Sequence, residues 1–358
     1  MKSKMKGAII VGIVMGLMLL GWADSVQASS KKYKFRFTSG YSPTAIDMVA
    51  IGKILKDISE RSGGAVTFET FWGGSLGKVL EHLDLIGKRT ADIGEAPLGA
   101  WPARLPLFGF EYAFPFGPPD PEVVTKCMYT MLSEFPEFDK QLRDNNVFLV
   151  AILPWDTYHG SSRDQMKSLK DLKGKKVGLW GVYFPKWIEA MGGIGVPRPM
   201  VESYMMMKTG VLDMSLEPVD VTLTHKHFEV AKHFFFLNSG AFTPKYVLMN
   251  LDAWKELTPE LQKLFLEVAR KNSLEFAAEL RENRKKIIDQ LLKEKKMLTS
   301  YEPTAEERSS WAAAMPDLPA EWAKSMEGKG LPGWKALDRW MKLTSDAGHK
   351  WPRAWGKR

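Results

Sequence analysis

The chain has 358 residues, a length that suggests two domains, and a formal net charge of +8. Its basic residues are spread along the chain and mixed with acids, whereas nucleic-acid binding favours a clustered basic stripe, so we expect no nucleic-acid partner. The single cysteine, Cys127, excludes a disulfide within the chain, and its apolar neighbours indicate a buried, unreactive thiol.

The N-terminus has the three parts of a secretory signal. Three lysines lie within the first six residues, an uncharged apolar run covers residues 8–20, and Val26–Ala28 offers small residues at a cleavage site. The apolar run is shorter than the roughly 20 residues that a membrane-spanning helix needs. We therefore expect a signal peptide over residues 1–28, cleaved near Ala28, and export to the periplasm; an uncleaved N-terminal anchor is the alternative.

The next part of the chain alternates strand and helix patterns. Tyr33–Phe37 alternates polar and apolar residues like a half-buried strand, and residues 45–62 have the apolar spacing of a helix. This alternation predicts an α/β architecture with a largely parallel sheet. The same reasoning gives three further elements: a strand over Ala65–Phe71, a helix over Leu76–Lys88 and a short strand over Ala91–Gly94.

The pattern restarts later, which suggests a second lobe. Strands are expected over Val147–Leu153 and Lys175–Leu179, and a helix over Tyr183–Met191. Thr258-Pro259-Glu260 is a strong helix start, with a capping Thr and Pro at the first helical position. No Gly or Pro interrupts this helix before Lys296. At 1.5 Å per residue it would measure about 55 Å, so we expect it to span both lobes.

The C-terminal segment from Trp311 onward carries six of the thirteen tryptophans. We expect these side chains to pack against a lobe rather than to contact a ligand.

No group of residues gives positive support for catalysis or for a cofactor. Residues 73–78 lack the GxxxxGK[ST] spacing of a phosphate-binding loop. His225 and His227 are two residues apart, but no third ligand completes a metal site, and we expect solvated or capping roles for both. The protein is thus expected to have no enzyme activity, no cofactor and no metal.

Several short segments match one known family in order and spacing from about residue 33 to residue 300. Together they resemble the solute-binding proteins of tripartite ATP-independent periplasmic (TRAP) transporters, the DctP-like family. The matching segments are Gly74–Gly77, Ala91–Ile93, Asp171–Gly174, Glu202 with Tyr204, Thr209–Asp213 with Pro218, Phe228–His233 and Asn250–Leu261.

The resemblance implies a periplasmic solute-binding fold: two α/β lobes joined by hinge strands and a long lobe-spanning helix, with the ligand closed between them by a hinge motion. Lobe I would comprise residues 29–154 plus about 243–290, and lobe II residues 155–242 plus about 291–358. The resemblance also implies a receptor, expected to be a monomer, that delivers a small organic solute to the small and large membrane permease subunits. A sensory ligand-binding protein is the alternative.

Two positions depart from the family pattern. After D-L-K-G the family has L-K-I-R, whose Arg binds a substrate carboxylate bidentately, but this chain has Gly178 there. The family's Asn in Gly-Gln-Glu-Asn-Pro is replaced by Glu217. The family implies an organic acid, held through Lys186, Arg163 or Lys245 in place of the missing Arg. The charge change leaves open a cationic, neutral or aromatic ligand bound through Glu217 and aromatic rings.

The expected ligand-binding residues combine these two positions with aromatic and acidic residues near them. Trp180 lies two residues after Gly178, and Glu95 follows the expected strand of lobe I. Either acid could instead be structural. The full expected set is Tyr41, Glu95, Trp155, Tyr158, Gly178, Trp180, Met200 and Glu217.

Overall fold

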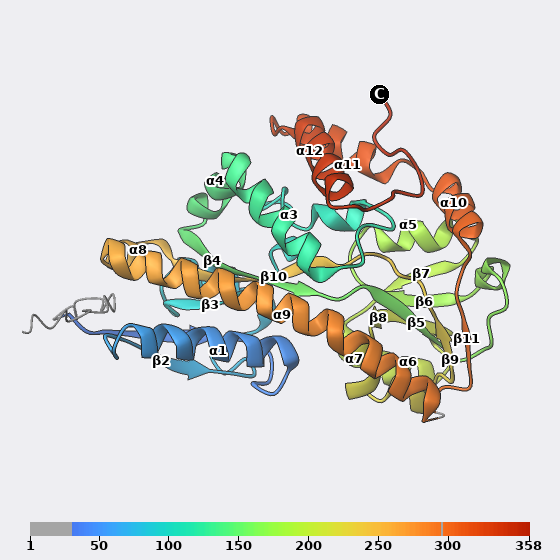
Figure 1. Ribbon diagram of the computed structural model, residues 1–358, viewed down its shortest axis with the longest axis horizontal. Coiled ribbons are helices and arrows are strands. Elements are labelled where there is room, and N and C mark those ends of the chain that lie inside the picture. Colours follow the sequence, from blue (N-terminus) through green and yellow to red (C-terminus); the bar gives the residue numbers. More distant parts are fainter. Residues whose placement is uncertain (1–30, 295) are drawn as a thin grey trace, which may run out of the picture.

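The computed structural model describes residues 31–294 and 296–358, and the expected signal peptide lies outside them. Two mixed sheets with helices packed on them form two lobes (Figure 1). The prediction of a two-lobe α/β fold is therefore confirmed. In the part of the chain that is described, no helix combines the length and apolar character required to cross a membrane.

The sheet of lobe I has five strands in the order β2-β1-β3-β10-β4. β1 pairs in parallel with β2 and β3, whereas β10 runs antiparallel to both β3 and β4. The sheet is mixed rather than largely parallel, because β10 enters it from the other lobe. The strands are β1 (Tyr33–Thr38), β2 (Val66–Phe71), β3 (Ile93–Ala96), β4 (Val147–Trp155) and β10 (Phe242–Asn250).

The helices of lobe I cover both faces of this sheet. α1 and the long helix α9 pack on one core cluster, and α2, α3 and α4 pack on another. The single helix expected over residues 76–88 is instead a 3₁₀ turn followed by a short helix. The elements are α1 (Ile46–Arg61), η1 (Val79–Glu81), α2 (His82–Gly87), η2 (Leu98–Ala100), η3 (Phe110–Ala113), α3 (Pro121–Glu134), α4 (Pro136–Asp144) and α8 (Leu251–Lys255).

The sheet of lobe II has six strands in the order β11-β9-β5-β8-β6-β7. β6 pairs in parallel with β7 and β8, and β5 runs antiparallel to β8 and β9. The strands are β5 (Tyr158–Ser162), β6 (Lys176–Leu179), β7 (Ile194–Pro197), β8 (Met214–Pro218), β9 (His233–Phe235) and β11 (Thr299–Tyr301). The helices are η4 (Leu169–Leu172), α5 (Phe184–Glu189), η5 (Met200–Glu202), α6 (Ser203–Lys208), α7 (Val219–Thr224) and η6 (His227–Glu229).

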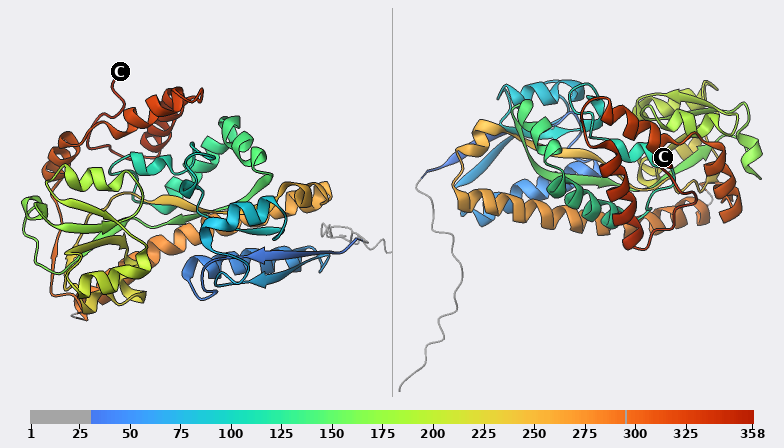
Figure 2. Two further views of the ribbon diagram at one scale, coloured as in Figure 1. Left: turned by 180° about the vertical axis from the view of Figure 1, so that it is seen from behind. Right: turned by 90° about the horizontal axis from the view of Figure 1, so that it is seen from above.

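The lobes are joined by two strand crossings and by α9 (Pro259–Lys293). β4 leads into β5 through Asp156 and Thr157, and β9 leads back into β10. α9 begins as expected, with the Thr258 side chain accepting a hydrogen bond from the Leu261 amide. It contacts α1 and β4 of lobe I and α7 of lobe II, and Figures 1 and 2 show it running along both lobes. The expected lobe-spanning helix is present.

The C-terminal segment packs against both lobes. Trp311 of α10 (Ala305–Ala314) is buried in the core of lobe II and donates a hydrogen bond from Nε1 to the Trp187 carbonyl at 2.7 Å. Trp322 of α11 (Leu318–Glu327) and Trp340 of α12 (Gly333–Asp346) are buried in the core of lobe I. The tryptophans of this segment are therefore mainly packing residues.

Candidate functional site: the cleft between the lobes

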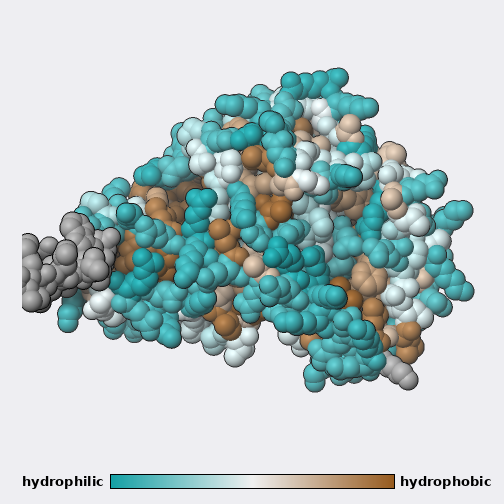
Figure 3. Space-filling model, in the orientation of Figure 1, coloured by the Kyte–Doolittle hydropathy of each residue, from teal (hydrophilic) through white to brown (hydrophobic). Residues whose placement is uncertain are grey.

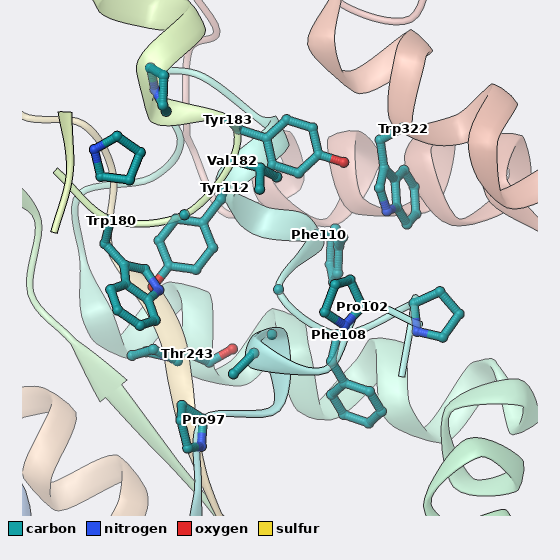
Figure 4. Close-up of a pocket in the computed structure, with 18 of the residues that line it drawn as sticks. Pro97, Pro102, Phe108, Phe110, Tyr112, Trp180, Val182, Tyr183, Thr243 and Trp322 are labelled. Atoms are coloured by element: carbon teal, nitrogen blue, oxygen red, sulfur yellow. The ribbon is translucent and has the colours of Figure 1, made fainter. Parts of the chain in front are cut away.

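A cleft of about 870 Å³ lies between the lobes. Its wall includes Pro97 and Phe108 of lobe I, Trp180 of lobe II and Thr243 of the hinge strand β10. Figure 4 shows Trp180 and Tyr112 on one side of the cleft and Trp322, from the C-terminal segment, on the other. The volume lies within the roughly 300–1,000 Å³ typical of small-molecule sites.

The cleft lies where several strands end. Pro97 directly follows β3, Trp180 follows β6, and Arg198 follows β7. In open α/β sheets, ligands bind in the crevice beyond the carboxyl ends of the strands. The position of the cleft is therefore the position in which this architecture places a ligand.

Arg198 is the buried cation of the cleft, and the sequence analysis did not identify it. The residue is 4% exposed, and its Nη2 donates to Glu217 Oε2 at 3.0 Å and also contacts Ser215 Oγ. Its Nε and Nη1 have no hydrogen-bond partner within residues 31–294 and 296–358. A buried guanidinium is costly unless its donors are satisfied, and the described protein leaves these two nitrogens unsatisfied.

Gly178 explains where the side chain of Arg198 lies. A Cβ atom at position 178 would lie 2.8 Å from Arg198 Nε and 2.5 Å from Leu212 Cδ1. Gly178 lies on β6, which is hydrogen-bonded to β7, so the arginine comes from the end of the neighbouring strand. The side chain of Arg198 thus occupies the space next to Gly178, the position at which the family pattern has an arginine.

Glu217 is fully buried and bound from several sides. Ser215 donates to its Oε2 at 3.0 Å, and His227 Nδ1 contacts its Oε1. Burial alone would raise the pKa of Glu217, but its contacts with His227 and Arg198 hold that pKa below its usual value. The expectation that His227 is solvated or capping is wrong, because its side chain is buried against this carboxylate. His225, by contrast, is only half-buried.

A second ion pair lies between α1 and the hinge strand β10. Lys245 binds Asp47, and both side chains are almost completely buried. The Lys245 ammonium lies 3.5 Å from the Tyr41 ring centroid and 5.1 Å from that of Trp155. Trp155 Nε1 also donates to Asp47 Oδ2 at 3.4 Å. Tyr41 and Trp155 are thus brought together, around a lysine that already has a counter-ion.

Glu95 forms a buried cluster at the end of β3. Its Oε1 lies 3.4 Å from His82 Nδ1 and accepts from Ser39 Oγ and the Gly40 amide at 3.3 Å. Burial tends to lower the pKa of His82, but the hydrogen bond and charge of Glu95 raise it above its usual value. These partners within lobe I favour the structural role for Glu95.

Of the expected ligand-binding residues, only Trp180 lines the cleft, and it is 37% exposed. Met200 follows the lining residue Pro199 and packs against the core of lobe II. Tyr158 is fully buried and stacks on Phe184, with ring centroids 5.3 Å apart.

Two of the three substitute cations considered for the missing arginine are engaged elsewhere. Lys186 pairs with Glu321 at 2.6 Å, and Arg163 lies 3.9 Å from Asp213. Neither lines the cleft. Lys245, the third, is paired with Asp47. Arg198 was missed because no strand was expected at residues 194–197. The available signal was an arginine between two prolines after a short apolar run.

The lining of the cleft offers no metal site. No group of three or more His, Cys, Asp or Glu side chains that could hold a metal ion occurs in the described part of the chain. Cys127 is buried in lobe I as expected, and burial raises the pKa of its thiol to about 11. The cleft can thus bind a ligand by charge, hydrogen bonds and apolar contact.

Comparison with known proteins identifies the family. The model of the bacterial extracellular solute-binding proteins, family 7 (DctP), matches residues 39–325. The C4-dicarboxylate-binding periplasmic protein DctP of Rhodobacter capsulatus is 25% identical over 91% of this chain and 97% of its own length. The 2,3-diketo-L-gulonate-binding periplasmic protein YiaO of Escherichia coli is 31% identical over 36% of this chain. The chain spans only 34% and 39% of two curated relatives that it matches.

A solved structure has the same fold. A TRAP periplasmic solute binding protein from Desulfovibrio salexigens, in an open complex, matches with a TM-score of 0.78 at 16% identity, over 88% of this chain and 96% of that one. This likeness shows the shared fold. Since the family model covers most of the chain, the resemblance found in the sequence is confirmed: the protein belongs to the bacterial extracellular solute-binding proteins of family 7, the DctP-like solute-binding proteins of TRAP transporters.

Proposed function

We propose that this protein is the periplasmic receptor of a TRAP transporter and that it captures a small organic acid in the cleft between its lobes. The loaded receptor delivers the acid to the small and large subunits of a membrane permease. The two closing units are the expected lobes, residues 29–154 with about 243–290 and residues 155–242 with about 291–358, except that α11 and α12 pack in the core of lobe I and move with it. The observation that carries the proposal is Arg198, a buried cation that lines the cleft with two unused donors.

Arg198 provides the chemistry that a carboxylate needs. A guanidinium donates charge-assisted hydrogen bonds to carboxylate oxygens, and its Nε and Nη1 lie on different edges of the plane, so each donates separately. Nη2 is occupied by Glu217 and Ser215, whereas Nε and Nη1 are not paired with the described part of the protein. Each charge-assisted hydrogen bond contributes roughly 1.5–3 kcal/mol. We propose that these donors take the role that the family gives to the arginine replaced by Gly178.

The contacts of Glu217 argue against a cationic ligand. Both of its oxygens have partners within lobe II, from Arg198, Ser215 and His227. A ligand cation would have to displace one of these buried contacts and would lie beside the Arg198 guanidinium. An acid is also the ligand named for two relatives, the C4-dicarboxylate-binding protein of R. capsulatus and the 2,3-diketo-L-gulonate-binding protein of E. coli.

A thermal-shift screen tests the ligand class. Panels of carboxylates, amines and neutral aromatics are added to the mature protein and to Arg198→Gln, in which the charge is lost and a hydrogen-bonding side chain is kept. A ligand at 100 times its Kd stabilises the folded state by about 2.7 kcal/mol. We expect carboxylates to stabilise the wild type, and this shift to be largely lost in Arg198→Gln.

Two other results would overturn parts of this proposal. Stabilisation by amines alone would show that the ligand is a cation and not an acid. Stabilisation by no compound in a broad metabolite panel would remove the receptor function. Transport and sensing are separated by the partner: cross-linking of the loaded protein in native membranes should capture permease subunits, and capture of a sensor kinase instead would favour the sensory alternative.

A further inference from the structure

We infer that the ligand is an acid with an apolar, ring-bearing body, bound with its carboxylate at Arg198 and its body along an apolar wall. The inference rests on the proposed function and concerns the part of the ligand away from the charge. Three features of the cleft carry it: exposed apolar side chains on both lobes, a lining made mostly of apolar residues, and a wall contributed by the C-terminal segment.

Apolar side chains on both lips of the cleft are exposed. Leu80 of lobe I is 61% exposed, and Trp180 and Val182 of lobe II are 37% and 73% exposed, and all three line the cleft. Leaving such surface in water costs about 25 cal/mol per Å². When the two lobes close on a ligand, this exposed apolar surface is removed from water. The burial is favourable only if the part of the ligand that faces it is apolar.

Most of the lining residues are apolar, and the hydroxyl groups of the lining come from Tyr112, Tyr183, Thr243 and Ser325. Of the lining residues in the described part of the chain, only Arg198 and Lys329 carry a charge, and both are cations. Phe108, Phe110 and Trp322 form much of the opposite wall, with the rings of Phe110 and Trp322 5.4 Å apart (Figure 4). Polar groups of a ligand buried against this wall without hydrogen bonds would lower the affinity.

The C-terminal segment supplies part of this wall. Trp322, Ser325 and Met326 of α11 line the cleft together with Lys329. Trp322 Nε1 is buried without a hydrogen-bond partner in the described residues, and the ring contributes apolar surface beside Met326. The face seen in Figure 3 is mostly hydrophilic, with apolar residues in separate groups. The apolar cleft wall therefore differs from the face seen in Figure 3.

Titration calorimetry on the mature protein tests the ligand class with four probes. Phenylacetate has both a ring and a carboxylate, D-glucuronate and pyroglutamate are polar acids, and benzyl alcohol has a ring without the acid. We expect phenylacetate to bind at least tenfold more tightly than each of the other three. The reason is that only phenylacetate satisfies both Arg198 and the apolar wall.

Substitutions at exposed positions locate the wall without disturbing the core. Trp180→Ala should weaken phenylacetate about tenfold, a loss typical of an aromatic contact, and change D-glucuronate little. The matched control is Val201→Ser, which alters an apolar side chain that is 74% exposed and does not line the cleft. Ser325→Asp should weaken phenylacetate several-fold by repulsion, whereas the neutral, similarly sized Ser325→Asn should not.

The outcomes separate this inference from the proposed function. If D-glucuronate or pyroglutamate binds most tightly and Trp180→Ala has no effect, the apolar-acid inference is wrong and the acid receptor stands. If benzyl alcohol binds with the same affinity as phenylacetate, the carboxylate does not contribute to binding. If no acid binds, the receptor function fails and the inference with it. Equal affinities in Ser325→Asp and Ser325→Asn would exclude the C-terminal segment from the site.

Discussion

Single buried charges determine how the cleft can bind. Arg198 and Glu217 are both buried to at least 96% and lie 3.0 Å apart. A buried ion pair adds little net stability relative to apolar residues, but the loss of one partner leaves the other charge uncompensated. Such a pair beside the cleft therefore fixes the position of the guanidinium, whose Nε and Nη1 remain unpaired in the described residues.

We predict that Glu217→Gln lowers the free energy of unfolding by about 3 kcal/mol, because Arg198 keeps its charge and loses its counter-ion. Urea unfolding followed by tryptophan fluorescence measures the change. Glu189→Gln, which neutralises an exposed carboxylate on α5 of the same lobe, is the control and should change stability by less than about 0.5 kcal/mol. Equal stabilities of the two variants would show that the pair is not structural.

Glu111 at the hinge predicts a dependence of stability on pH. It accepts hydrogen bonds from the amide and hydroxyl of Thr243, but burial raises its pKa from 4.5 to about 7. Between pH 4.5 and about pH 7, Glu111 is protonated in the folded chain and ionised in the unfolded chain. The free energy of unfolding therefore falls as pH rises from about 4.5 to about 7, by on the order of 3 kcal/mol.

Glu111→Gln should remove this contribution while keeping an acceptor for Thr243. Urea unfolding of both proteins at about pH 5 and pH 8 measures it: the wild type should lose stability relative to the variant at the higher pH. Groups shared by the two proteins cancel in this difference. A difference that does not change with pH would mean that Glu111 is ionised in the folded state throughout.

At the scale of elements, the parallel pairing of β6 and β7 places Arg198 beside position 178. Gly178 pairs with Val196, two residues before Arg198, and side chains two residues apart on a strand point to the same face. The arginine of the family pattern and Arg198 would therefore reach one region of space from adjacent strands.

We predict that the two positions can exchange the arginine. Arg198→Gly should weaken binding of the tightest carboxylate from the screen at least tenfold, and Gly178→Arg combined with Arg198→Gly should recover most of it. The Leu212 side chain, close to a Cβ at position 178, would have to move slightly. Calorimetric titration of both variants measures the exchange. Unchanged binding in the single variant, or no recovery in the folded double variant, would contradict it.

The elements with strong local signals could be predicted, and those defined by distant pairing could not. The cap at Thr258 and the uninterrupted apolar spacing predicted helix α9, with an end within three residues of its observed end at Lys293. Strands β7, β9 and β11 have three or four residues each, and their sequences lack the apolar–polar alternation that indicates a strand. The positions Gly178 and Glu217 could be found from the family pattern. Arg198 could not, because its role depends on the pairing of β7.

At the scale of the whole molecule, a cleft between two hinged lobes implies that ligand binding and closure are coupled. The crossings at Asp156 and before β10 are short, and α9 contacts both lobes. A ligand favours closure only through contacts that it makes better in the closed state. Arg198 and Thr243, from lobe II and the hinge, and Phe108 of lobe I line the same cleft, and we propose that they provide such contacts.

We predict that a stabilising carboxylate lowers the radius of gyration measured by small-angle X-ray scattering, because closure brings the lobes together. Arg198→Gln at the same ligand concentration should keep the larger radius. Val201→Ser, which does not line the cleft, should close like the wild type. Closure without ligand, or closure of Arg198→Gln to the same extent, would show that the acid group does not drive the motion.

The central claim is that a buried arginine from β7 holds the acid group of the ligand. Titration calorimetry of the wild type and of Arg198→Gln, with the carboxylate that gives the largest thermal shift, tests it most directly. The claim predicts one bound ligand per chain in the wild type and a Kd at least tenfold higher in the variant, the loss of about one charge-assisted hydrogen bond. Equal affinity in both proteins would contradict it.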